Sequence, residues 1–110
     1  MIADDTHKVS KMPKFITKMF KNLKILEIKN LKVEYLNRES LKNFNKLEKL
    51  GLPLGRLTRI SSDLFEHVAN IRVVDFTRNN LVKFGLASFL KPPHLETVNL
   101  FGNPCGIDLL

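Results

Sequence analysis

The chain has 110 residues, of which 44% are hydrophobic, which is enough for one modest core and too little for two independent domains. Eighteen lysines and arginines against eleven acidic residues give a formal net charge of +7, which favours solubility and anionic partners. A single cysteine excludes an internal disulfide framework, and no stretch approaches the roughly 18 consecutive apolar residues of a membrane span.

The N-terminal segment, residues 1–22, is the least regular part of the chain. Asp4 and Asp5 interrupt its start and no long apolar run follows them, so it lacks the pattern of a secretory signal. Val9 and Phe20 fit the repeat described below when that repeat is extrapolated backwards, whereas Asp4 falls on a position that should be apolar. We therefore expect residues 1–22 to be a degenerate repeat or the cut end of a longer array.

Lysines recur in the same segment, where no acidic residue lies between Thr6 and Leu26. The backward extrapolation places all of them outside the core: Lys8, Lys11, Lys14, Lys18, Lys21 and Lys24. Such a basic end is usually a solvated surface that also discourages aggregation. The functional alternative, which stays open, is a weak and salt-dependent site for heparin-like sugars, anionic lipid or nucleic acid.

From Leu23 onwards the apolar residues recur with a period of 24 residues. Three full repeats cover residues 23–46, 47–70 and 71–94, and a partial repeat covers residues 95–110. In the full repeats, positions 1, 4, 6, 11, 14, 19 and 22 are apolar in 20 of 21 cases, where composition alone would give about nine. The spacing does not fit one face of a helix, and the alternation of Leu26, Glu27 and Ile28 predicts a short strand.

This pattern resembles the leucine-rich repeat family in its 24-residue type, LxxLxLxxNxLxxLxxxxFxxLxx, over about residues 20 to 105. The resemblance implies an α/β-type repeat solenoid, a short arc with one parallel strand per repeat on its concave face and loop or 3₁₀ segments on its convex face. One repeat cannot bury its own apolar face, so stacking at the strand spacing of about 4.8 Å has to merge the repeats into one core. We expect a single domain over residues 1–110.

The ninth position of the family pattern carries asparagine, whose amide can bond backbone groups of adjoining coils. Asn79 and Asn103 fit this position, whereas Leu31 and Gly55 replace asparagine in the first two repeats. This departure weakens the expectation of regular coils in the N-terminal half.

Cys105 falls on position 11 of the last repeat, where the earlier repeats carry Val33, Leu57 and Leu81. A free cysteine behaves as a small hydrophobe, so core filling is one interpretation. The family resemblance offers another, because the ending GNPCGIDLL is similar to the start of the cysteine-containing end caps of many extracellular members. In that case Cys105 is half of a disulfide whose second cysteine has been lost from the sequence.

Patterns for catalysis and metal binding are weak. A cysteine nucleophile needs a histidine within reach, and His7, His67 and His94 lie in no motif. The stretch GLPLGRLT lacks the glycine spacing and the lysine of a phosphate-binding loop. No histidines or carboxylates stand at metal-ligand spacing. We therefore expect neither an enzyme nor a cofactor or metal site.

The strands of the expected arc place positions 2, 3, 5, 7 and 8 on its concave face. Position 2 alternates in charge along the stack, through Lys24, Glu48, Arg72 and Glu96. Neighbouring coils are therefore expected to form weak exposed ion pairs.

The concave face also carries the apolar residues Leu54, Val73 and Phe101. An open face of mixed charge with exposed apolar groups suits a protein or peptide ligand better than a small molecule, which needs a deep apolar pocket. Arginine and aromatic side chains dominate interface energetics. The candidates for partner contacts are accordingly Arg72, Asp75, Arg78 and Phe101.

These observations predict a non-catalytic protein-recognition module, with polyanion binding as the alternative function. Phe65 and Phe89 at position 19 resemble extracellular, receptor-like members of the family, and the cap-like ending agrees with them. The missing secretory signal points the other way. We expect a fragment of a longer extracellular or secreted protein, whose binding surface could also lie in repeats outside this chain; a cytoplasmic scaffold is the alternative.

Overall fold

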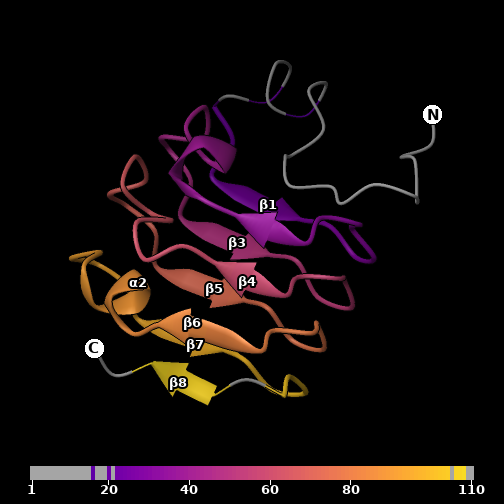
Figure 1. Cartoon of the computed structure of the whole chain (residues 1–110). Coiled ribbons are helices and arrows are strands. Elements are labelled where there is room, and N and C mark those ends of the chain that lie inside the picture. The colour runs from indigo at the N-terminus through magenta and orange to yellow at the C-terminus, as the bar shows by residue number, and fades with distance from the viewer. Residues whose placement is uncertain (1–15, 17–19, 21, 105, 109–110) are drawn as a thin grey trace.

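The computed structural model describes residues 16, 20, 22–104 and 106–108. Successive coils of the chain stack on one another, and each full coil contributes one strand to each of two parallel sheets (Figure 1). The first sheet has the order β1-β3-β5-β7, with β1 (Ile25–Glu27), β3 (Lys49–Gly51), β5 (Val73–Asp75) and β7 (Thr97–Asn99). The second has the order β2-β4-β6-β8, with β2 (Tyr35–Leu36), β4 (Arg59–Ile60), β6 (Lys83–Gly85) and β8 (Gly106–Asp108). The predicted solenoid of stacked parallel strands is confirmed.

The register of the first sheet places equivalent repeat positions directly beside one another. Leu26 pairs with Leu50, Leu50 with Val74, and Val74 with Val98. Leu50 and Val74, in the two inner strands, are completely buried. The period of 24 in the sequence is therefore the length of one coil.

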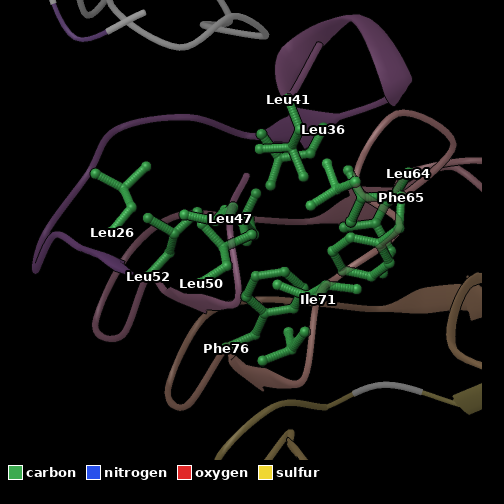
Figure 2. Packing of buried hydrophobic residues seen from close by; sticks show 14 of the residues in the cluster. Leu26, Leu36, Leu41, Leu47, Leu50, Leu52, Leu64, Phe65, Ile71 and Phe76 are labelled. Carbon is green, nitrogen blue, oxygen red and sulfur yellow. The ribbon is translucent and has the colours of Figure 1, made fainter. Parts of the chain in front are cut away.

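The core runs through the stack as one continuous cluster (Figure 2). Its largest fully buried side chains come from all three full repeats: Val33, Leu36, Leu41, Phe44, Leu47, Leu50, Leu52, Leu57, Leu64, Ile71, Phe76 and Leu81. Equivalent positions at the two ends, such as Leu23 in the first coil and Leu95 in the last, are only partly buried. A coil thus obtains its burial from the coils on either side of it.

The second sheet goes beyond the prediction, which placed a single strand in each coil. Strands β2, β4 and β6 begin with an outward residue followed by a buried one, as in Tyr35 and Leu36 of β2 or Arg59 and Ile60 of β4. Backbone bonds join the coils here too, because the Ser61 amide donates to the Leu36 carbonyl at 2.9 Å. An alternation over two residues is too short to be recognised as a strand from sequence.

Short helical segments lie between the second sheet and the next coil, where the family pattern predicts loop or 3₁₀ structure. They are the 3₁₀ helix η1 (Arg38–Ser40) and the helix α2 (Ala87–Leu90), which Figure 1 shows at the side of the stack. In the third coil, Phe89 of α2 packs edge-on against Phe84 with ring centroids 5.3 Å apart, and lies 6.3 Å from the ring of Phe65. The phenylalanines at position 19 therefore contact each other across adjacent coils.

The asparagines at position 9 bond to the preceding coil. Asn79 is buried; its Oδ1 accepts from the Leu57 amide at 3.0 Å, and its Nδ2 donates to the Leu52 carbonyl at 2.8 Å. Asn103 repeats this geometry one coil later, accepting from the Leu81 amide at 3.0 Å. Each amide thus satisfies backbone groups that stacking removes from water.

The N-terminal coils pair in the same register as the others although asparagine is missing from their ninth position. β1 pairs with β3 over three residues, as β3 does with β5. At Gly55 the backbones approach closely, since a Cβ there would lie 2.9 Å from the Leu31 carbonyl oxygen and 2.7 Å from Oδ1 of Asn79. Direct backbone packing therefore replaces the missing asparagine between these coils.

Candidate functional site

The outward side chains at positions 2, 3 and 5 of the first sheet form one surface, which we call the first-sheet face. Position 3 aligns Ile25, Lys49, Val73 and Thr97, and position 5 aligns Glu27, Gly51, Asp75 and Asn99. On this face, ion pairs join neighbouring coils between Lys49 and Glu27 at 3.1 Å and between Arg72 and Glu96. The second of these was predicted from the charge alternation at position 2.

Both ion pairs are solvent-exposed, so each contributes only about 0.2–1 kcal/mol to stability. Arg72 and Glu96 keep about half of their side-chain surface accessible. The pair aligns β5 with β7 and still presents both charges to a partner.

Asp75, predicted as a contact residue, is tied into the turn that follows its strand. Its Oδ1 accepts hydrogen bonds from the Thr77 amide at 2.9 Å and from the Thr77 hydroxyl. Asn99 makes the equivalent bond in the next coil, accepting from the Phe101 amide at 3.0 Å. Position 5 therefore shapes the turn as well as the surface.

A second part of the surface is the turn edge, which we define as positions 7 to 10 of each coil, residues 29–32, 53–56, 77–80 and 101–104. Every coil adopts a left-handed backbone at position 8: φ is 60° at Asn30, 57° at Leu54, 57° at Arg78 and 80° at Gly102. Neighbouring turns are joined by backbone bonds, from the Leu54 amide to the Thr77 carbonyl at 2.9 Å and from the Arg78 amide to the Phe101 carbonyl at 2.8 Å. The sequence contained a signal for this turn in Asn30 and Gly102, but sequence reasoning missed it because Leu54 and Arg78 occupy the same position.

The structure brings two of the four predicted contact residues together on this edge. The Arg78 guanidinium lies 5.7 Å from the ring centroid of Phe101, within the range of a cation–π contact. Phe101 is 68% exposed. Arg72 lies before the start of β5 and Asp75 at its end, so they are not part of this pair.

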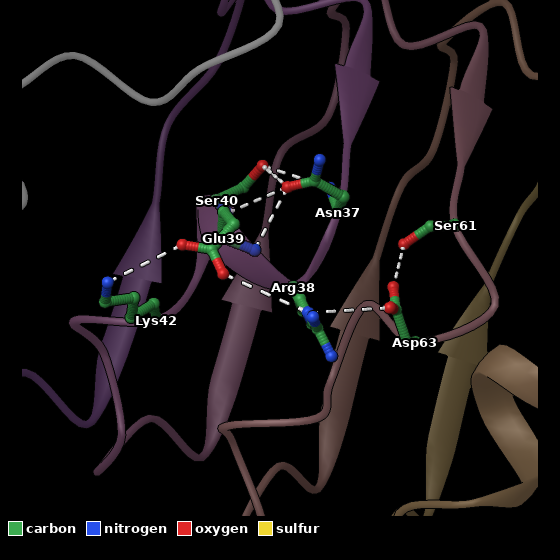
Figure 3. Close-up of polar contacts among 7 residues, drawn as sticks. All are labelled: Asn37, Arg38, Glu39, Ser40, Lys42, Ser61 and Asp63. Carbon is green, nitrogen blue, oxygen red and sulfur yellow. Dashed lines mark hydrogen bonds and ion pairs between the residues drawn. The ribbon is translucent and has the colours of Figure 1, made fainter.

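Polar groups on the opposite side of the stack join the first two coils, as Figure 3 shows. Asn37 caps η1, since its Oδ1 accepts from the Glu39 and Ser40 amides at 3.0 and 3.2 Å. Arg38 of η1 lies 3.8 Å from the carboxylate of Asp63 in the next coil. The hydrogen bond from the Ser61 hydroxyl, at 2.5 Å, is the main cause that holds the pKa of Asp63 below its ordinary value of 3.8, with a further contribution from Arg38.

Several residues considered in the sequence analysis lie outside the described residues. These are Cys105, His7 and the candidate polyanion lysines Lys8, Lys11, Lys14, Lys18 and Lys21. His67 and His94 are exposed. Within the described ranges, no group of three or more metal-ligating side chains comes together.

An apolar hollow of about 240 Å³ lies at the β1 end of the stack, lined by Ile16, Phe20, Leu23, Leu26 and Ile28. The described residues that line it carry no titratable side chain. In the part of the chain that the structure describes, no helix is long and apolar enough to cross a lipid bilayer.

Comparison with protein families agrees with this geometry. A family model described as leucine rich repeat matches residues 45–104, which is more than half of the chain. The matched segment contains the second and third coils and most of the turn edge. The comparison with curated proteins finds no match.

Proposed function

Because the chain belongs to the leucine-rich repeat family, we propose that it is a non-catalytic module that binds a protein or peptide on its first-sheet face and turn edge. The observation that carries the proposal is the composition of this open surface. It presents the exposed apolar residues Ile25 and Phe101 beside accessible charges such as Arg72 and Arg78. Aromatic and arginine side chains are the usual anchors of protein interfaces.

A small molecule fits this surface poorly. Ligands of that size need concave sites that bury most of their surface. The first-sheet face is built from strands of three residues laid side by side, and the hollow at the β1 end lies away from Arg72, Arg78 and Phe101. The arrangement therefore favours a macromolecular partner.

The proposal is tested by photo-crosslinking from chosen positions. A photo-reactive phenylalanine analogue is placed at Val73 on the first-sheet face. The matched control carries it at the exposed His67, which belongs neither to the first-sheet face nor to the turn edge. The tagged proteins are irradiated in extracts of the cells that produce the protein. We expect discrete adducts from position 73 and none from position 67, whereas equal labelling at both positions, or labelling from 67 alone, contradicts the proposal.

We further propose that the module is part of a longer extracellular protein. The support is the resemblance of Phe65 and Phe89, whose rings contact each other at position 19, to the phenylalanines of extracellular family members. A cytoplasmic scaffold that uses the same surface is the alternative. Immunolocalisation of the endogenous protein distinguishes the two, and purely cytoplasmic staining contradicts the extracellular setting.

Polyanion binding is a second candidate, favoured by one feature of the second sheet. The Arg59 guanidinium lies 4.9 Å from the ring centroid of Tyr35 in the adjoining strand, and Arg56 is exposed nearby in the same coil. With the net charge of +7, these arginines and the N-terminal lysines would bind sulfate or phosphate groups in a salt-dependent way. Elution from heparin resin should move to lower salt in Arg56→Gln/Arg59→Gln or in a variant with Lys8, Lys11, Lys14, Lys18 and Lys21 changed to Gln; unchanged elution of both contradicts this function.

A further inference from the structure

The turn edge holds a leucine in a backbone conformation that leucine rarely adopts. Leu54 has φ of 57°, in the left-handed region where glycine and asparagine are favoured. The equivalent positions of the first and last coils carry Asn30 and Gly102, the residue types that suit this turn. Leu54 is also 45% exposed, so much of its apolar surface remains accessible to solvent. Unfavourable backbone geometry together with an exposed apolar side chain is the combination found at binding sites.

The next coil places a charged group beside this leucine. Arg78 occupies the same position, and neighbouring turns are bonded backbone to backbone, so their Cα atoms lie about 4.8 Å apart. Its guanidinium is directed over the ring of Phe101 in the coil beyond. Among the described residues, no carboxylate pairs with Arg78.

Gly102 makes this arrangement possible. A Cβ at that position would lie 2.8 Å from Cγ of Arg78 and 3.4 Å from its Cα. The absence of a side chain lets the aliphatic stem of Arg78 lie along the turn towards Phe101. The arginine is therefore held in place before any partner arrives, which lowers the entropic cost of binding.

Charge along the turn edge is of one sign. Its sixteen residues include the cations Lys29, Lys32, Arg56 and Arg78 and no aspartate or glutamate. The first-sheet face next to it carries charges of both signs, because it also has the acidic residues Glu27, Glu48 and Glu96. An acidic partner segment is therefore complementary in charge to the turn edge, whereas the first-sheet face would repel it at its glutamates.

We propose that Leu54, Arg78 and Phe101 form the anchor of the recognition surface, and that its ligand is an extended peptide segment carrying a carboxylate between two large apolar side chains. This rests on the proposed function and assigns the partner chemistry to one edge of the surface. The span from the coil of Leu54 to that of Phe101 is two coil spacings, about 9.6 Å, which an extended chain covers in about three residues. The apolar side chains of the ligand contact Leu54 and Phe101, and its carboxylate contacts Arg78.

The test uses a phage-displayed library of random twelve-residue peptides selected on the whole chain. We expect enriched peptides to share an Asp or Glu between two large apolar residues spaced about three apart. Binding of the enriched peptides is then measured to Leu54→Asn, Arg78→Gln and Phe101→Ser, and each variant should weaken the dissociation constant tenfold or more. Leu90→Asn is the matched control, because Leu90 is 71% exposed on α2, away from the edge.

Leu54→Asn also separates binding from folding. Asparagine takes the left-handed backbone readily, so the melting temperature of this variant should stay close to that of the wild type while its affinity falls. A loss of affinity that tracks a fall in melting temperature would overturn the assignment.

The outcomes distinguish this inference from the proposed function. If the selected peptides bind the three edge variants as tightly as the wild type but bind Arg72→Gln or Val73→Ser more weakly, the proposed anchor is wrong. Recognition by the first-sheet face is then still supported. Peptides without an acidic residue overturn the partner chemistry. A library that yields no peptide sensitive to any of these five changes contradicts both the anchor and the proposed function.

Discussion

At the scale of single residues, the residue at position 9 determines how closely the backbones of two adjacent coils pack. Asn79 fills the space between its coil and the one before it with an amide that satisfies a buried N–H and a buried carbonyl. Gly55 leaves no such space, because a Cβ added there would lie closer than contact distance to the Leu31 carbonyl oxygen and to Oδ1 of Asn79. The family pattern, read without neighbours, would recommend asparagine at both positions.

Gly55→Asn is therefore expected to destabilise the protein even though it restores the family pattern. Its Cβ would meet Oδ1 of Asn79 at 2.7 Å and the Leu31 oxygen at 2.9 Å, which forces the two coils apart. Overpacking of this kind typically costs about 1–3 kcal/mol of unfolding free energy. Urea denaturation monitored by circular dichroism measures it.

Gly55→Ala is the control for the same substitution, because it adds the Cβ without the amide. It should be destabilised as well, since the close contacts begin at that atom. An unfolding free energy of Gly55→Asn above that of the wild type would show that the coils adapt and that hydrogen bonding outweighs the steric conflict.

At the scale of elements, η1 connects the first coil to the second through charge. Arg38 reaches across to Asp63, and Lys42 lies 3.6 Å from Glu39 on the same side (Figure 3). These groups are exposed, so their effect on stability is small and depends on ionisation. The pH dependence isolates the contribution of Asp63.

The folded protein lowers the pKa of Asp63, chiefly through the Ser61 hydrogen bond. A carboxyl with a lowered pKa stabilises the fold at pH above its unfolded value of 3.8, and this contribution is lost as pH falls through the lower folded value. We therefore expect the wild type to be more stable than Asp63→Asn at about pH 6 and the difference to shrink towards about pH 3. Chemical denaturation of both proteins across this range measures the difference, and a gap that stays constant with pH would contradict the assignment.

The second sheet marks the limit of what sequence alone could predict about the elements. The first-sheet strands were recognisable because Leu26, Glu27 and Ile28 alternate within a longer repeat. The strand at Tyr35–Leu36 contains one outward and one inward residue, and only pairing with the next coil makes it a strand. The contact of Arg78 with Phe101 could not be predicted either. It depends on a left-handed turn, and an arginine at position 8 does not indicate such a turn in the sequence.

At the scale of the whole molecule, the fold followed from one number, the period of 24, since that period set the register of all four first-sheet strands. The burial gradient along the stack followed less directly. Equivalent residues differ in exposure only because of where their coil lies, as Val74 is completely buried while Val98 is only partly buried. The position of a residue within the repeat predicts whether its side chain points into the core. How completely that side chain is buried depends on whether its coil lies inside the stack or at its end.

This gradient predicts different costs for one substitution at two equivalent positions. Val74→Ala removes two methyl groups from a closed part of the core and should lower the unfolding free energy by about 2–3 kcal/mol. Val98→Ala makes the same change in β7, which among the described strands pairs only with β5, and should cost less than about 1 kcal/mol because Val98 is only partly buried. Guanidinium denaturation of the two variants measures the ratio, and equal losses would show that the coils do not depend on their neighbours in this way.

The backbone bonds between coils run in two directions. At the start of each strand the amides of Arg72 and Val73 donate back to the Glu48 carbonyl, whereas beyond the strand the amides of Phe76 and Arg78 donate forward to Asn99 and Phe101. Transient detachment of the last coil would therefore open Phe76 and Arg78 to deuterium from the solvent while Arg72 and Val73 stay protected. Hydrogen exchange should therefore differ between the two ends of each strand. The amide of Arg78, the arginine that we place at the centre of recognition, is protected only while the following coil stays attached.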